Sequence, residues 1–296
     1  MNLTGCGTAL VTPFRKDGGL DEGALVKLVD WQIRSGINFL LSCGSTGEAA
    51  TLEENEWLRA VAITSEAAAK RVPVWAGCTD NSTARAVAKA KKLAAQGGID
   101  AVLTASPYYN KPTQEGQYIH FRAIAEAVYP IPVVLYNIPG RTGISIEAAT
   151  VARLANDVPN IEAIKDSSGK IDFTANLVRQ TPDNFSVFCG DDYLALGAIS
   201  VGARGLVSVA SNEIPAEMTA MVTAALKNDF AAARKIESKY ATLLAANFWE
   251  SNPAPAKFVL SLMGISEATV RLPLLTPSEP TRARLEKLAA ELGLKA

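Results

Sequence analysis

Two residues that end apolar runs carry side chains suited to amine and proton-transfer chemistry. Lys165 closes the run 161–164, so its stem leaves an apolar strand and its amine is expected to face the protein interior. Loss of hydration disfavours the charged ammonium, and a neutral lysine can attack a ketone to form a Schiff base. Tyr136 ends the run 133–135, and its phenol could move the protons that this reaction needs. The structural alternatives are a lysine that turns to solvent or pairs with Asp166, and a packed tyrosine.

Groups that could bind a carboxylate follow two other apolar runs. Ser45 and Thr46 lie in the glycine-bracketed turn 44–47, where free backbone N–H groups and hydroxyls can hold an anion. Arg141 follows Pro139, which is expected to fix a turn, and a guanidinium there could bind a carboxylate with two hydrogen bonds. Taken singly these signals are weak, because glycine pairs are common in loops and a loop arginine usually lies on the surface.

Short β-branched runs alternate with amphipathic stretches along most of the chain. The runs are apolar on both faces, which is typical of parallel strands covered by helices. Eight alternations predict an α/β fold, a closed (β/α)8 TIM barrel, because an open doubly wound sheet usually has fewer strands and no G-x-G-x-x-G follows the first run. The runs are 7–11, 37–42, 72–77, 99–104, 131–136, 161–165, 185–189 and 205–209, and the helical stretches include 22–35, 54–70, 83–96, 117–128 and 147–155.

The strand signal stops after Asn212, and only helical patterns follow. These patterns cover 216–227, 230–246, 254–263 and 281–292, with a proline-containing link at 252–255. We therefore expect a catalytic barrel over residues 1–225 and a C-terminal helical domain over residues 226–296.

The candidate residues are expected to meet at one end of this barrel. Barrel enzymes build their sites from the loops after the strands, and here those loops are rich in hydroxyls, glycine and charge. Lys165 and Tyr136 end consecutive strands, so they should lie side by side. Tyr108 and Tyr109 fall in one of these loops, between two prolines, a placement that suits an interface as well as a pocket.

Composition excludes several other classes of function. The chain has 296 residues, 48% of them hydrophobic, and a net charge of -1 without blocks of like charge, so a nucleic-acid partner is not expected. No apolar run reaches the ~18 residues of a membrane span. The single histidine, His120, argues against a metal site and against a Ser-His-Asp triad. Four dispersed cysteines favour a reducing compartment and a cytoplasmic protein.

Six motifs together resemble a known family. The chain is similar over essentially its whole length to the Schiff-base lyases related to dihydrodipicolinate synthase and N-acetylneuraminate lyase, and Arg141 together with the 252–257 segment favours the dihydrodipicolinate synthase branch. The motifs are GSTGE at 44–48, YYNKP at 108–112, YNIPGRTG at 136–143, IKDSSG at 164–169, GDD at 190–192 and NPAP at 252–255.

The resemblance implies a lyase that needs no cofactor and condenses pyruvate with L-aspartate 4-semialdehyde in diaminopimelate and lysine biosynthesis. By this likeness Lys165 forms the imine with pyruvate, and a proton relay runs through Tyr136, Thr46 and Tyr109. Tyr109 would come from a neighbouring subunit of a homotetramer made of two tight dimers. The remaining implied contacts concern substrate binding: the N–H groups of Ser45 and Thr46 on the pyruvate carboxylate, Arg141 on the semialdehyde carboxylate, and the main chain near Gly190 and Val207 along the pocket.

The sequence also departs from the family pattern. Relatives inhibited by lysine use histidines and a glutamate at positions that correspond here to Glu54, Trp57 and Arg85, whereas Asn81 and Tyr108 match. An arginine in place of a carboxylate repels an ammonium, so we expect weak or absent inhibition by lysine.

Alternatives within and outside this family stay open. Ser45 and the Asp-Ser-Ser run at 166–168 replace commoner residues, which leaves open a pyruvate-dependent aldolase for a 2-keto-3-deoxy acid, 4-hydroxy-2-oxoglutarate or a sialic acid. Arg141 counts against these. A catalytically silent sensor is disfavoured by Lys165, Tyr136, Thr46 and Tyr109 together, and a metal-dependent aldolase by the single histidine.

Overall fold

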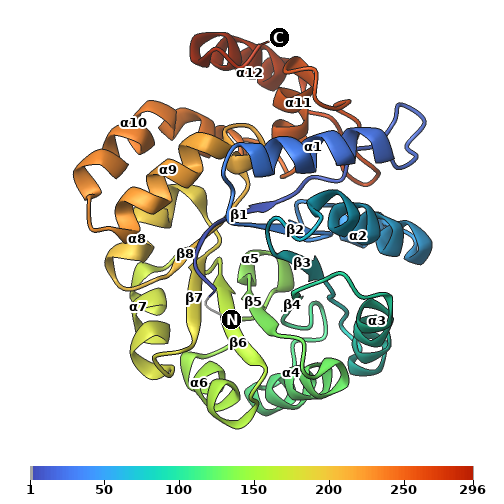
Figure 1. Cartoon of the computed structure of the whole chain (residues 1–296), viewed down its shortest axis with the longest axis vertical. Coiled ribbons are helices and arrows are strands. Elements are labelled where there is room, and N and C mark those ends of the chain that lie inside the picture. The colour runs from blue at the N-terminus through green and yellow to red at the C-terminus, as the bar shows by residue number, and fades with distance from the viewer. Residues whose placement is uncertain (1–2, 296) are drawn as a thin grey trace.

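Eight parallel strands close into one barrel in the computed structural model, which describes residues 3–295 (Figure 1). Each strand pairs with the next one along the chain, and β8 returns to pair with β1. The predicted (β/α)8 class is confirmed, although the first strand begins and ends two residues earlier than expected. The strands are β1 (Gly5–Ala9), β2 (Phe39–Ser42), β3 (Val74–Gly77), β4 (Ala101–Ala105), β5 (Val133–Asn137), β6 (Ile161–Asp166), β7 (Ser186–Cys189) and β8 (Gly205–Ser208).

A ring of helices surrounds the barrel and covers the outward faces of the strands (Figure 1). Local signals start several of them: the Asp21 and Thr113 side chains accept hydrogen bonds from the first turns of α1 and α4. The helices of the ring are α1 (Glu22–Arg34), α2 (Glu54–Ala68), α3 (Thr83–Gln96), α4 (Gln114–Val128), α6 (Ala148–Asp157), α7 (Ile171–Gln180), α8 (Ala195–Ser200) and α9 (Pro215–Leu226), with short 3-10 turns at Ala49–Thr51 (η1), Asp192–Leu194 (η2) and Ala210–Asn212 (η3).

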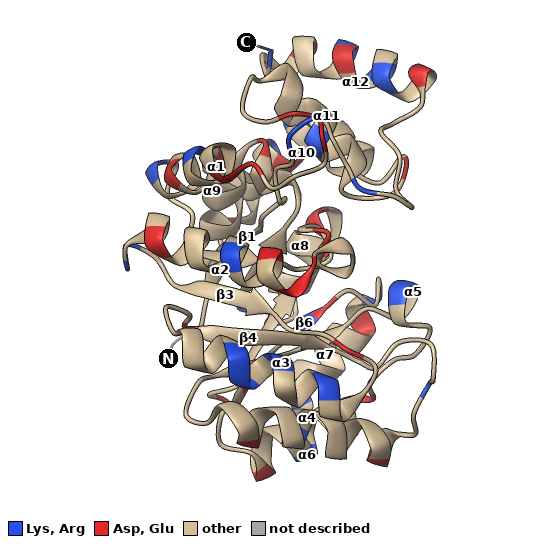
Figure 2. Cartoon of the chain, turned by 90° about the vertical axis from the view of Figure 1, so that its right-hand side faces the viewer, with Lys and Arg blue, Asp and Glu red and all other residues tan. Residues whose placement is uncertain are grey.

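The expected turn at Pro139 is a short helix instead. Helix α5 (Pro139–Thr142) begins at the proline, whose fixed backbone angle suits a first helical turn, and Gly143 ends it in the left-handed conformation. In Figure 1 α5 lies inside the ring of helices, and in Figure 2 it lies on the side of the barrel opposite the N-terminus. This short helix therefore carries Arg141 to the barrel mouth.

Aromatic rings fill the interior of the barrel. Phe39 stacks on Trp75 with ring centroids 4.0 Å apart, and Phe188 meets both rings edge-on at 5.5 and 5.3 Å. All three are buried in a cluster that is separate from the larger core between strands and helices. Gly7 makes this packing possible, because a Cβ there would overlap the ring of Phe39. The lumen is thus a packed core.

Three further helices extend beyond the ring: α10 (Phe230–Ala246), α11 (Ala254–Leu262) and α12 (Glu279–Leu292). Helix α10 packs against α9, while α11 and α12 pack together above α1 (Figure 1). The predicted division at residues 225 and 226 falls at the end of α9.

Basic and acidic residues are interspersed along the helices in Figure 2. Among residues 3–295 no helix is both long and apolar enough to cross a membrane.

Candidate active site

Lys165 lies inside the barrel at the carboxyl end of β6. In the strand register it is the partner of Tyr136 on β5 and of Phe188 on β7, and its side chain is only 5% exposed. The lysine Nζ lies 4.4 Å from the centroid of the Tyr136 ring. The two residues are side by side, as the barrel topology predicts. An amine and a phenol therefore share one nearly enclosed position.

Asp166 does not pair with this lysine. Successive residues of a strand face opposite sides of the sheet, so the Asp166 carboxyl points outward and accepts hydrogen bonds from Asn137 Nδ2 at 2.9 Å and from the Thr174 and Ser168 hydroxyls at 2.9 and 3.0 Å. Burial raises the pKa of Asp166, and these hydrogen bonds oppose the rise. The carboxyl ties β6 to the start of α7 and leaves Lys165 free to face the lumen.

Gly190 makes room for the lysine on the next strand end. A Cβ at this position would lie 2.8 Å from Lys165 Cε and would also overlap the Ser167 hydroxyl. Its backbone N–H donates to the Asp166 carbonyl at 2.8 Å, which fixes the loop. Val207 on β8 is fully buried in the same interior cluster as Tyr136. Both predicted pocket residues therefore lie at the lumen. Gly190 contributes by having no side chain, which leaves space for Lys165.

Two carboxyls follow Gly190, those of Asp191 and Asp192, and neither is among the predicted site residues. Burial raises the pKa of Asp191 to about 6; the charge of Lys165 lowers it, and the neighbouring Asp192 and Asp166 raise it further. Asp192 is more deeply buried, and its Oδ2 accepts hydrogen bonds from the backbone N–H groups of Val209 and Ala210 at 3.0 Å each. The site thus places two carboxyls near the Lys165 amine, whose charge lowers the pKa of each against the effect of burial.

The turn that holds Ser45 and Thr46 is fixed by its own backbone. Gly47 N–H donates to Gly44 C=O and Glu48 N–H donates to Ser45 C=O, both at 3.1 Å. A Cβ at Gly47 would lie 3.1 Å from the Leu10 carbonyl and from Cys43 Cα, so glycine relieves a tight contact between the turn and the backbone. Thr46 is 3% exposed, whereas Ser45 is exposed.

Asn252, which the sequence analysis quoted only as part of a motif, joins two of the predicted residues. Its Nδ2 donates to Thr46 Oγ1 at 3.0 Å, and its backbone carbonyl accepts from Arg141 Nη2 at 3.1 Å. The loop after α10 therefore reaches the barrel mouth. Tyr109 is not enclosed with these residues: its ring is 88% exposed and its backbone has a positive φ of 73°.

A buried ion pair fastens the Thr46 turn to α11. Lys257 Nζ lies 2.5 Å from Glu48 Oε1 and 2.8 Å from the Thr269 carbonyl, and both charged side chains are almost completely buried. Desolvation lowers the pKa of Lys257 to about 8, although Glu48 favours its charged form. Lys257 is the one charged residue in the otherwise apolar helix Ala254–Leu262, a pattern that could have signalled a buried partner from sequence.

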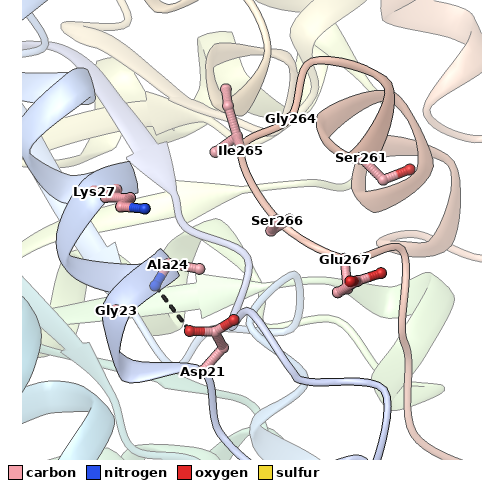
Figure 3. A pocket seen from close by; sticks show the side chains of 9 residues that line it. All are labelled: Asp21, Gly23, Ala24, Lys27, Ser261, Gly264, Ile265, Ser266 and Glu267. Carbon is pink, nitrogen blue, oxygen red and sulfur yellow. Dashed lines mark hydrogen bonds between the residues drawn. The ribbon is translucent and has the colours of Figure 1, made fainter.

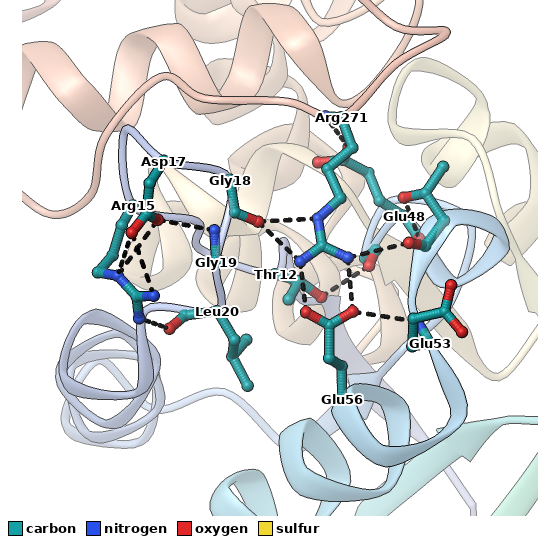
Figure 4. A network of polar contacts seen from close by, with 12 residues as sticks. Thr12, Arg15, Asp17, Gly18, Gly19, Leu20, Glu48, Glu53, Glu56 and Arg271 are labelled. Atoms are coloured by element: carbon teal, nitrogen blue, oxygen red, sulfur yellow. Dashed lines mark hydrogen bonds and ion pairs between the residues drawn. The ribbon is translucent and has the colours of Figure 1, made fainter.

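Arg271 completes this network (Figure 4). Its backbone N–H donates to Glu48 Oε2 at 2.9 Å, and its guanidinium forms hydrogen bonds of 2.5 and 2.6 Å with the two Glu56 oxygens. The same guanidinium also donates to the Gly18 carbonyl. Three separate parts of the chain are thereby held against the turn that carries Thr46.

A surface cleft of about 380 Å³ lies elsewhere, between the start of α1 and the segment after α11 (Figure 3). Its lining includes Asp21, Lys27 and Glu267, but none of the predicted site residues. The Asp21 carboxylate there caps α1 by accepting from Ala24 N–H at 2.9 Å. The geometry of the strand ends, and not this cleft, defines the candidate active site. The residues 3–295 contain no group of three or more His, Cys, Asp and Glu side chains arranged to hold a metal ion.

A closed parallel barrel with a buried lysine and hydroxyl groups at the carboxyl ends of its strands defines a class of barrel enzymes. The chain matches the sequence profile described as the dihydrodipicolinate synthetase family over residues 2–292. It is 56% identical to the 4-hydroxy-tetrahydrodipicolinate synthase of Acidobacterium capsulatum, over 99% of this chain and 97% of that protein.

Solved structures agree with this match. The dihydrodipicolinate synthase of Aquifex aeolicus superposes with a TM-score of 0.96 at 37% identity and 99% coverage of both chains. The chloride-inhibited enzyme of Acinetobacter baumannii, complexed with pyruvate, superposes with a TM-score of 0.95 at 40% identity, over 98% of this chain and 99% of that one. The chain belongs to the dihydrodipicolinate synthetase family. The resemblance stated from the motifs, and with it the lyase class, is confirmed.

The first prediction concerns Asp191. Its pKa is higher in the folded protein than the 3.8 of a free side chain, so its ionisation opposes folding: the penalty is absent below about pH 4 and complete above about pH 6. Asp191→Asn removes that charge without changing the shape. Relative to the wild type we expect about 1–2 kcal/mol more free energy of unfolding near pH 7.5 and no gain near pH 4. Urea titrations at the two pH values measure this, and an equal difference at both would contradict it.

The second prediction concerns the buried ion pair. Lys257→Met leaves the Glu48 carboxylate buried without its partner, so the free energy of unfolding should fall by about 3–5 kcal/mol. The double variant Glu48→Gln with Lys257→Met has no buried charge and should recover part of the loss. Lys287→Met, at an exposed position of α12, is the control and should change stability by less than about 0.5 kcal/mol. A loss at Lys257 no larger than that of the control would show that the pair does not hold the turn.

Proposed function

We propose that this protein condenses pyruvate with L-aspartate 4-semialdehyde to form 4-hydroxy-tetrahydrodipicolinate through a Schiff base on Lys165. The observation that carries the proposal is the buried Lys165 amine beside Tyr136, in a chain of this family. Lysine Nζ attacks C2 of pyruvate, water leaves, and the imine forms. Loss of a proton from the methyl group gives an enamine, whose carbon attacks the aldehyde. The semialdehyde's own amine then displaces Lys165 and closes the ring.

Each step of this reaction moves a proton, and the hydroxyl groups of the site are suited to that task. Tyr136 is next to the amine and would take and return protons as water is lost. Thr46 would pass them on to Tyr109 of a neighbouring subunit, since Tyr109 is too exposed to act within its own chain. The backbone N–H groups of Ser45 and Thr46 would hold the pyruvate carboxylate.

Arg141 would bind the carboxylate of the second substrate at the barrel mouth. Its hydrogen bond to the Asn252 carbonyl would help to orient the guanidinium toward that carboxylate. Gly190 and Val207 would line the pocket beside the imine. This arrangement requires a neighbouring subunit, and we propose a homotetramer of two tight dimers. We place the enzyme in the cytoplasm, where Cys6, Cys43, Cys78 and Cys189, all unpaired and buried, stay reduced.

The direct test is chemical trapping. The protein is incubated with pyruvate, reduced with borohydride and digested, and the peptides are examined by mass spectrometry. We expect one reduced pyruvate adduct, on Lys165, and none in a Lys165→Ala control. An adduct on another lysine, or none, would overturn the mechanism. Turnover with L-aspartate 4-semialdehyde, compared with sugar-derived aldehydes, then tests the choice of second substrate.

A further prediction concerns inhibition by lysine. The Arg85 guanidinium is bonded to Asp80 and Asn81 at 2.8 Å, and it would present positive charge at the position where, by the family resemblance, the ammonium of a bound lysine would lie. Trp57 is buried and donates to the Gly77 carbonyl, so its ring belongs to the core. We expect weak or no inhibition in a steady-state assay with added L-lysine. Half-maximal inhibition at a submillimolar concentration would contradict this.

A further inference from the structure

The loop between α10 and α11 places Asn252 against two of the residues assigned to catalysis. Its amide Nδ2 donates to Thr46 Oγ1 at 3.0 Å, and its carbonyl oxygen accepts from Arg141 Nη2 at 3.1 Å. The residue is 5% exposed, so water does not compete strongly for either bond. The two contacts use different parts of Asn252: its side chain reaches Thr46, and its main chain reaches Arg141.

The direction of the Asn252–Thr46 bond decides what the threonine can do. A hydroxyl has one proton and accepts through its lone pairs. Because Asn252 donates, the Thr46 proton is left for another acceptor. With the amide reversed, the Asn252 oxygen would take that proton. The observed orientation therefore leaves Thr46 able to donate within the relay.

Asn252 itself is not fully satisfied. Within residues 3–295 its Oδ1 is buried and has no hydrogen-bond partner. Buried acceptors are rarely left unpaired, and an apolar side chain at this position would avoid the cost. Among residues 3–295 the one side-chain hydrogen bond of Asn252 is therefore the bond to Thr46.

The surrounding structure holds this bond in place. Helix α11 begins two residues after Asn252, and its Lys257 is paired with Glu48, two residues after Thr46. The same pair of segments is thus joined twice, by an ion pair that fixes the turn and by an amide that fixes the hydroxyl. Lys257 Nζ also lies 4.0 Å from the centroid of the Phe14 ring, which restricts it further.

We propose that Asn252 is a positioning residue that holds the Thr46 hydroxyl as a proton donor in the relay. This inference rests on the proposed function, in which Thr46 carries protons between Tyr136 and Tyr109. The C-terminal helical segment then contributes a side-chain hydrogen bond to the proton relay of the barrel.

Three substitutions test the role of the bond. Asn252→Ala removes the donor, and Asn252→Asp keeps the shape but offers only acceptors when ionised. Both should lower kcat about 10–100-fold, with the aspartate variant at least as impaired as the alanine variant. KM for L-aspartate 4-semialdehyde should change little, because Arg141 contacts the main chain of residue 252. The matched control is Ser251→Ala, at the exposed neighbouring position, which should keep wild-type kcat.

A double-mutant cycle separates positioning from general damage. If Asn252 acts through Thr46, then Asn252→Ala should lower kcat by less than about twofold in a Thr46→Val background, because the hydroxyl that it orients is gone. A full additional loss in that background would overturn the proposal, as would wild-type kcat in Asn252→Asp. Circular dichroism identifies any variant that fails to fold, and the isosteric aspartate variant then serves alone.

Failure of the proposed function is distinguishable from failure of this inference. The wild type is assayed first, for the Lys165 adduct and for product from L-aspartate 4-semialdehyde. If the adduct forms without that product, L-aspartate 4-semialdehyde is not the second substrate. The same variants are then compared by their rate of pyruvate trapping. Equal trapping rates in the wild type and in Asn252→Asp would then reject the role of Asn252.

Discussion

The register between β5, β6 and β7 is the constraint on which the site depends. It places Lys165 beside Tyr136 and in line with Phe188, on the inner face of a closed barrel. A shift of one residue would turn the lysine outward and put Asp166 in the lumen. The hydrogen bonds of Asp166 to Asn137 and Thr174 stabilise the observed register from the outer face. The reactive amine and its structural support are therefore neighbours in sequence on opposite sides of one strand.

The interior packing explains why the chemistry is confined to one end. The stacked and edge-on rings of Phe39, Trp75 and Phe188 occupy the lumen, and Gly7 leaves space for them. The lysine stem consequently lies against packed residues, while its amine lies toward the mouth. Gly190 then gives the side chain room, and the carboxyls of Asp191 and Asp192 are near enough that the charge of Lys165 lowers the pKa of each.

Local patterns in the sequence predicted the barrel and the residues at its strand ends, because a strand and the polar residue that ends it can both be recognised from a few consecutive residues. A polar residue that ends an apolar run marks Lys165 and Tyr136, and consecutive strands of a barrel must be adjacent. The segment at Pro139, expected to be a turn, is a short helix. A turn and a short helix differ by only a few backbone angles, and proline and glycine are typical of both.

Contacts between distant parts of the chain were beyond the reach of local patterns. The bonds from Asn252 to Thr46 and from Lys257 to Glu48 join residues 206 and 209 positions apart. The residues of each pair come together only because α11 docks against the barrel. The local sequence around either residue does not indicate which residue it will contact. The raised pKa of Asp191 was equally hidden, since it depends on burial by several elements at once.

We propose that Lys165 forms the imine within a site shared with Tyr136 and Thr46. A crystal structure of the wild-type protein soaked with pyruvate tests this most directly. We predict continuous electron density from Lys165 Nζ to pyruvate C2, with the pyruvate carboxylate against the N–H groups of Ser45 and Thr46. Pyruvate bound without a covalent link, or joined to a different lysine, would contradict it.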